Sequence, residues 1–161
     1  MRGAWPDVSK MVIIAAPHSS VWDAVWGFAV KLAMDMAIVF MGKKEIFVGP
    51  LGWYLRRLGG VPVDRAVPVG VVDQAIKRIC EADRIWFTLA PEGTRRRVDR
   101  WKPGFWKIAR GANVPVCCVA FHFPEKCIIV GPTYEMTDDF EADLARIRAW
   151  YAPFQGKHRG A

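Results

Sequence analysis

The sequence is poor in the residues that bind metal ions or cross-link small proteins. Its 161 residues include three histidines and four cysteines. No Cys-x-x-Cys pair occurs, and Cys117 and Cys118 are adjacent within an apolar run. This pattern indicates neither a zinc site nor a disulfide framework. We therefore expect reduced, buried thiols and no bound metal.

The chain also lacks an uninterrupted hydrophobic run of membrane-spanning length. The longest candidate, residues 24–42, contains Lys31 and Asp35. Each such charge costs about 2.5 to 3.5 kcal/mol near the centre of a bilayer. The N-terminus has Asp7 and Lys10 before a short apolar run, which makes a poor secretory signal. We expect any membrane contact to be peripheral, with the protein in the cytoplasm.

Aromatic and basic residues are plentiful. The chain has eight Trp, nine Phe and a net charge of +7, which suits an anionic membrane, phosphorylated lipids or nucleic acid as the partner. Apolar residues make up 52% of the sequence, enough for one domain with a core. No internal repeat or low-complexity segment occurs. We expect a single domain over residues 1–161, with a frayed tail at 155–161.

Strand-like and helix-like segments alternate along the chain. This predicts an α/β fold with a mostly parallel central sheet flanked by helices on both faces. A helix over residues 21–36 is expected to pack one apolar face against the sheet, formed by Val21, Ala24, Val25, Phe28, Leu32 and Met36. Pro62 makes residues 59–65 an edge strand or an extended loop. Besides this segment, the expected strands are 11–16, 37–41, 84–90, 114–121 and 126–131. The expected helices are 21–36, 49–58, 69–82, one starting near Pro103, and 138–151.

His18 and Asp23 lie five residues apart where the first apolar run ends. Ligands bind at the carboxyl ends of strands in open α/β sheets. A histidine there can act as a base near neutral pH, and a carboxylate on its second ring nitrogen would fix its tautomer. Ser20 and Asp23 also have the spacing of a helix capping box. The two interpretations of Asp23 are compatible in space.

A second candidate site is the turn Ala-Pro-Glu-Gly-Thr-Arg at residues 90–95. Gly93 would let the backbone approach a ligand, and Glu92 could accept a hydrogen bond from a hydroxyl. Arg95 could hold a phosphate through a charge-assisted fork. The alternative is an ordinary turn followed by a solvated basic run. Arg65, after the extended segment, either points into a cleft or lies paired on the surface.

The segment 49–58 combines aromatic side chains with two arginines. Trp53 and Tyr54 could dip into the headgroup boundary of a membrane while Arg56 and Arg57 meet lipid phosphates. The alternative is that the two aromatic rings fill the core and the arginines are solvated.

Three motifs in order resemble the signatures of the glycerolipid acyltransferase family. His-Ser-Ser-Val-Trp-Asp at 18–23 is similar to the first, His-x4-Asp, and Gly-Gly-Val-Pro-Val-Asp-Arg at 59–65 resembles the second. Residues 90–95 resemble the third, Phe-Pro-Glu-Gly-Thr-Arg, with Ala90 in the place of phenylalanine. The resemblance covers roughly residues 18–121, including a weaker fourth block at 114–116.

This resemblance implies a glycerol-3-phosphate acyltransferase-like fold and transfer of a fatty acyl group. The donor would be acyl-CoA or acyl carrier protein, and the acceptor the hydroxyl of a lysophospholipid or glycerol phosphate. It implies His18 as the general base and Asp23 as the group that orients it, with Arg65 and Arg95 on the acceptor's phosphate. Neither a cofactor nor nucleic acid is expected, and the protein would lie on the inner face of an anionic membrane. The residues assigned to acceptor binding are Arg65, Glu92, Gly93, Thr94 and Arg95.

Two other functions stay open from the sequence. The same dyad could pass the acyl group to water, as in a thioesterase or lipid hydrolase, with Ser19 or Ser20 as an imaginable nucleophile. No Gly-x-Ser-x-Gly elbow supports this hydrolase. The chain could also be a non-catalytic, basic peripheral membrane binder. Compared with longer family members, we expect no N-terminal membrane helices.

Overall fold

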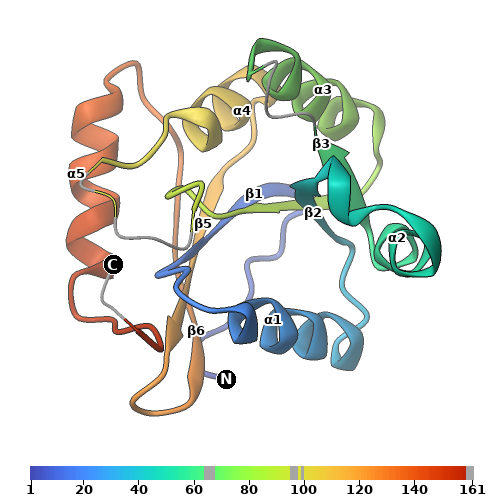
Figure 1. The fold of residues 1–161 in the computed structure, drawn as a ribbon. Helices are drawn as coiled ribbons and strands as arrows, with labels where there is room; N and C mark the ends of the chain where they lie inside the picture. Colours follow the sequence, from blue (N-terminus) through green and yellow to red (C-terminus); the bar gives the residue numbers. More distant parts are fainter. Residues whose placement is uncertain (64–67, 95–97, 99, 159–161) are drawn as a thin grey trace.

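The chain folds into a six-stranded sheet with helices on both faces (Figure 1). The computed structural model describes residues 1–63, 68–94, 98 and 100–158. The strand order is β3-β2-β4-β1-β5-β6, and every neighbouring pair is parallel except β5 and β6. The predicted α/β fold class with a mostly parallel sheet is confirmed.

The elements follow the predicted order, and their ends differ from the prediction by up to three residues. The strands are β1 (Lys10–Ala16), β2 (Ile38–Lys43), β3 (Gly60–Val63), β4 (Ile85–Leu89), β5 (Val116–His122) and β6 (Cys127–Tyr134). The helices are α1 (Val21–Ala33), α2 (Gly49–Arg57), α3 (Pro68–Glu81), α4 (Gly104–Ala112) and α5 (Phe140–Tyr151), and a 3-10 turn, η1 (Lys44–Ile46), precedes α2.

The central strand β1 is buried on both sides because helices cover both faces of the sheet. Val12, Ile14 and Ala16 belong to the cluster that includes α3, α4 and α5. Met11 and Ile13 alternate with them and join a second cluster, on the α1 face. Figure 1 shows α1 on one side of the sheet and α3 and α4 on the other. A continuous apolar run is the pattern expected of such a doubly covered parallel strand.

The face that α1 presents to the sheet differs from the prediction. Val21, Val25 and Leu32, expected to pack inward, are 60%, 46% and 61% exposed. Phe28 and Met36 do pack inward as predicted, Phe28 edge-on against Phe40 with ring centroids 4.8 Å apart. Val30, which was not predicted, also packs on the sheet. The prediction was wrong for Val21, Val25 and Leu32 because α1 is apolar on several sides, so its periodicity does not define the buried face fully.

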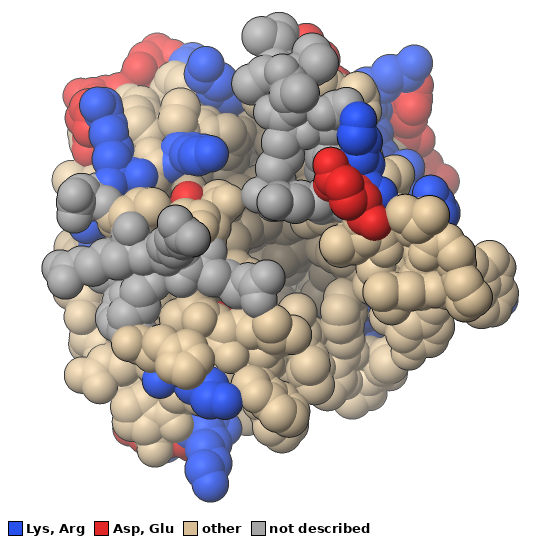
Figure 2. All heavy atoms as spheres, in the orientation of Figure 1, with Lys and Arg blue, Asp and Glu red and all other residues tan. Residues whose placement is uncertain are grey.

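Exposed apolar side chains gather over α1 and α2. Trp53 and Tyr54 of α2 are 68% and 50% exposed, so they do not fill the core. Trp22 and Trp26 of α1 are also exposed. In Figure 2 the surface over α2 and α1 is mostly tan, whereas Lys and Arg side chains gather elsewhere on the same face. Of the helices in the described part of the chain, none has both the length and the apolar character needed to cross a bilayer.

A buried tyrosine ties the last helix to the centre of the sheet. The Tyr151 hydroxyl donates to the Ile14 carbonyl at 2.6 Å and accepts from the Val119 amide at 2.9 Å. Burial raises the pKa of Tyr151 well above its usual value, so the phenol stays protonated and keeps its donor. The hydroxyl thereby satisfies groups of β1 and β5 next to an irregularity in the β5 pairing.

We predict that Tyr151→Phe lowers the free energy of unfolding by about 1 to 3 kcal/mol, because it leaves buried backbone groups without a partner. Tyr54→Phe, which removes an exposed hydroxyl, is the matched control and should change stability little. Urea unfolding of the two variants checks this, and equal stability of both would contradict the role given to the Tyr151 hydroxyl.

Candidate active site

The candidate site lies at the carboxyl edge of the sheet, where two neighbouring strands end. β1 and β4 are adjacent and parallel, with Ile14 opposite Leu89. The segments that leave them therefore start side by side, and they carry His18 and Glu92. Two of the three motifs found in the sequence thus meet in space.

His18 and Asp23 are in contact. The imidazole Nδ1 lies 3.2 Å from Asp23 Oδ2, and the carboxylate is fully buried while 27% of the His18 side chain is exposed. With Nδ1–H donating to the carboxylate, Nε2 is the basic nitrogen of the ring. This is the geometry that a histidine base and its orienting carboxylate require.

Asp23 also caps the helix that it begins. Its Oδ2 accepts from the backbone amides of Ser19 and Ser20, both at 2.8 Å, and Ser20 Oγ accepts from the Trp22 amide at 3.2 Å. A reciprocal capping box is therefore present at the start of α1. The Asp23 carboxylate therefore caps α1 and contacts His18 at the same time. It holds the loop between β1 and α1 and orients the His18 imidazole.

Glu92 supports the histidine from the neighbouring strand. It is almost fully buried, and its two oxygens accept from the His18 backbone amide at 3.3 and 3.2 Å. A buried carboxylate on a backbone amide holds the main chain of a loop. Glu92 thus positions the segment that carries His18, in addition to the acceptor-binding role that the motif implies.

A lysine that the motifs do not include lies beside the turn after β4. Gly93 has φ +66°, and a Cβ built there would lie 3.1 Å from Cδ and Cε and 3.3 Å from Nζ of Lys102. The Lys102 amide donates to the Pro91 carbonyl at 2.9 Å. A side chain at residue 93 would therefore be strained and would press on Lys102. Lys102 belongs to a segment, residues 101–107, that mixes aromatic and lysine side chains just after the motif, but the sequence does not show that Lys102 contacts the turn.

The end of the described chain also reaches the site. The His158 amide donates to Ser19 Oγ at 3.3 Å, and Lys157 Nζ lies 5.4 Å from the centroid of the Trp22 ring. Upstream, the Gln155 amide donates to His122 Nδ1 at 3.1 Å. The expected frayed tail includes residues 159–161, which lie outside the described residues.

Other predicted site residues are not brought to the dyad. Arg65 and Arg95 lie outside the described residues. Thr94 is half-buried in the turn after β4. The four residues predicted to contact a membrane belong to α2, which lies beyond the β3 edge of the sheet (Figure 1). They are Trp53, Tyr54, Arg56 and Arg57.

The serine side chains of the site and the two buried cysteines of β5 are poorly suited to act as nucleophiles. Ser19 and Ser20 are buried, and both hydroxyls accept backbone hydrogen bonds. Burial raises the pKa of the Cys117 thiol to about 11 and that of Cys118 to about 12. Both thiols therefore stay protonated near neutral pH. Among the described residues, no group of His, Cys, Asp and Glu could hold a metal ion.

Comparison with known proteins gives two matches. A family model described as "Acyltransferase" matches residues 6–122. A protein of Streptococcus pneumoniae named 1-acyl-sn-glycerol-3-phosphate acyltransferase is 33% identical over 122 residues, which are 74% of this chain and 44% of that protein. The match therefore spans less than half of that relative. No solved structure matches the chain significantly.

We predict that Asp23→Ala destabilises the fold more than Asp23→Asn, by about 1 to 2 kcal/mol, because asparagine keeps an oxygen for the Ser19 and Ser20 amides. Urea unfolding measures both variants. Asp73→Ala, at an exposed position of α3, is the control for loss of a carboxylate. Equal destabilisation by the alanine and asparagine variants at residue 23 would show that the cap contributes nothing.

A second prediction concerns the thiols. In the folded protein a maleimide should label exposed Cys80 rapidly and leave Cys117 and Cys118 unlabelled until the chain is unfolded, because those two are buried and protonated. Mass spectrometry of peptides after timed labelling gives the rates. Fast native labelling of either buried cysteine would contradict the burial described above.

Proposed function

The chain belongs to the acyltransferase family, and from this premise we propose that it transfers a fatty acyl group from a thioester to a hydroxyl of a lysophospholipid or glycerol phosphate. The donor is acyl-CoA or acyl carrier protein, and no other cofactor takes part. The name of the Streptococcus pneumoniae relative supports 1-acylglycerol 3-phosphate as the first acceptor to test.

The contact between His18 Nδ1 and the buried Asp23 carboxylate, at 3.2 Å, carries this proposal. His18 Nε2 takes the proton of the acceptor hydroxyl as its oxygen attacks the thioester carbonyl. The tetrahedral intermediate collapses, the C–S bond breaks, and the imidazolium returns the proton to the leaving thiolate. Asp23 holds the ring and stabilises its cationic form. General base catalysis of this kind contributes roughly 10²- to 10⁴-fold in rate.

The acceptor's phosphate needs cations near the dyad. The proposal assigns this role to Arg65 and Arg95, on the resemblance of their motifs, and adds Lys102. The Lys102 ammonium lies beside Gly93, in the turn that follows Glu92, so it can contribute positive charge at that edge of the sheet. Glu92, Gly93 and Thr94 form the rest of this side of the acceptor site.

Membrane contact is part of the same proposal. The exposure of Trp53 and Tyr54 on α2, followed by Arg56 and Arg57, is typical of a segment that lies in the headgroup region. The exposed rings of α1 extend this apolar surface. We place the protein peripherally on the inner face of an anionic membrane, where acyl-CoA and acyl carrier protein are available.

Hydrolysis of the thioester is the alternative that keeps the same dyad. The hydrogen bonds to the Ser19 and Ser20 hydroxyls give no support to a serine nucleophile. A hydrolase that uses water would release thiol without an acceptor, so acceptor dependence separates the two reactions.

We predict that thiol release from oleoyl-CoA requires both lysophosphatidic acid and His18. His18→Ala should lower turnover by at least about 10²-fold, because the base is lost. Asp23→Asn should lower turnover while retaining most of the cap. A coupled thiol assay with and without the acceptor measures this, and the acylated product is identified by mass spectrometry.

His122→Ala is the matched control, because His122 also ends a strand but does not contact Asp23. It should retain most of the activity. Full turnover in a folded His18→Ala variant would falsify the proposed mechanism. Thiol release without lysophosphatidic acid would identify a thioesterase instead.

A further inference from the structure

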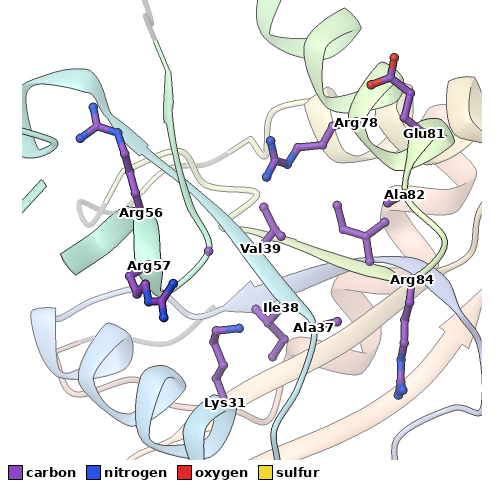
Figure 3. Close-up of a pocket in the computed structure, with 12 residues that line it drawn as sticks. Lys31, Ala37, Ile38, Val39, Arg56, Arg57, Arg78, Glu81, Ala82 and Arg84 are labelled. Carbon is purple, nitrogen blue, oxygen red and sulfur yellow. The ribbon is translucent and has the colours of Figure 1, made fainter. Parts of the chain in front are cut away.

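A cleft of about 460 Å³ lies at the edge of the sheet opposite His18. Its floor is formed by Ile38 and Val39, where β2 begins, and by Ile85, where β4 begins. The last turns of α1, α2 and α3 surround it (Figure 3). Because His18 follows the carboxyl end of β1, the cleft is separated from the dyad by the length of the strands.

The cleft is strongly cationic. Five basic side chains and one carboxylate, that of Glu81, line it. Glu81 is partly neutralised by Lys77, whose Nζ lies 3.8 Å away. Several like charges around a concave surface focus a positive potential there. The basic residues are Lys31, Arg56, Arg57, Arg78 and Arg84.

Three of these cations have partners within the fold. Lys31 Nζ donates to the Met36 carbonyl at 2.8 Å, and Arg56 donates to the Phe47 carbonyl at 3.0 Å. The Arg84 guanidinium lies 5.7 Å from the centroid of the Trp86 ring. Figure 3 shows Arg84 turned away from the other basic groups. These contacts explain three of the positive charges as parts of the fold.

Arg57 and Arg78 differ from these three. Within the described part of the chain, neither has a hydrogen bond or an ion pair. Both are exposed, and in Figure 3 the Arg78 guanidinium extends across the cleft toward Val39. Arg57, Arg78 and Lys31 line the same cleft, so an anion bound there would be attracted by all three positive charges. Burial lowers the pKa of Lys31, so its ammonium is partly withdrawn from water.

We propose that this cleft binds a phosphate group through Arg57 and Arg78, with Lys31 adding charge. Planar guanidinium groups match the oxygen geometry of phosphate, which makes arginine the suitable residue. The phosphate is either free in solution or part of an anionic phospholipid headgroup. The site is separate from the dyad, and its occupancy does not depend on acyl transfer.

The position of α2 favours a phospholipid headgroup over free phosphate as the ligand of the cleft. The same helix carries exposed Trp53 and Tyr54 and ends with Arg57 on the cleft. Arg57 lies about one helical turn after Trp53 and Tyr54 on α2. If those two aromatic side chains enter a bilayer, Arg57 and the cleft that it lines therefore lie at the depth of the lipid phosphates.

Amide NMR separates this site from the dyad, because each residue reports locally. Inorganic phosphate, titrated against chloride at constant ionic strength, should shift the signals of Arg57, Gly59 and Arg78. Arg78→Gln should weaken the phosphate affinity at these signals by about five- to tenfold, as expected for loss of one charge-assisted contact. Lys107→Gln removes an exposed charge of α4 away from the cleft, so it should leave the phosphate affinity unchanged.

Vesicle co-sedimentation distinguishes the two sources. Vesicles of phosphatidylglycerol and phosphatidylcholine should bind Arg78→Gln more weakly than Lys107→Gln if the ligand is a headgroup. Equal binding of the two variants, with the NMR effect present, assigns the site to free phosphate.

Unchanged signals at Arg57, Gly59 and Arg78 with both phosphate and vesicles would overturn the proposal. Equal phosphate affinity of Arg78→Gln and wild type at those signals would do the same. Thiol release in detergent is measured on the same samples, so a failure of the proposed acyl transfer is recognised independently.

Discussion

The buried carboxylate of Asp23 is the constraint on which the candidate site depends. One oxygen faces three donors, the amides of Ser19 and Ser20 and the Nδ1 of His18. The other oxygen has no hydrogen-bond partner among the described residues. A charge so deeply buried is tolerated because these donors and the N-terminal turn of α1 neutralise it. The loop between β1 and α1 is therefore folded around the carboxylate, and His18 is oriented as a consequence.

The fold was predictable to the extent that local signals agreed. Apolar runs marked the strands, and the Pro62 segment became an edge strand, as its missing amide donor requires. The capping box placed the start of α1. The face of α1 was not predictable, because apolar residues occur all around that helix. Which side is buried depends on the sheet beneath it and on the cap at Asp23, and neither is visible in helical periodicity.

The sequence predicted several residues of the candidate site, but not the tertiary contacts between them. Spacing pointed to His18 and Asp23, yet the support from Glu92 comes from a residue 74 positions away, through the parallel pairing of β1 and β4. Lys102 and the segment ending at His158 reach the site only through tertiary folding. No periodicity or motif encodes such contacts, so these residues emerge from the structure alone.

Basic residues lie at both edges of the sheet, but the acidic residues around them differ between the two edges. At the carboxyl edge, Lys102 lies beside Gly93, in the turn that follows the buried residue Glu92. At the amino edge, Glu81 is the one carboxylate among the described residues that line the cleft with Arg57 and Arg78, and Lys77 Nζ lies 3.8 Å from it. Asp35 acts on Lys31 of the same cleft. A phosphate bound at the carboxyl edge, as proposed for the acceptor, would therefore lie close to the buried acidic residues Asp23 and Glu92 as well as to Lys102. An anion in the cleft at the amino edge would meet five basic side chains, so its affinity should fall as ionic strength rises, while the planar guanidinium groups favour phosphate over chloride.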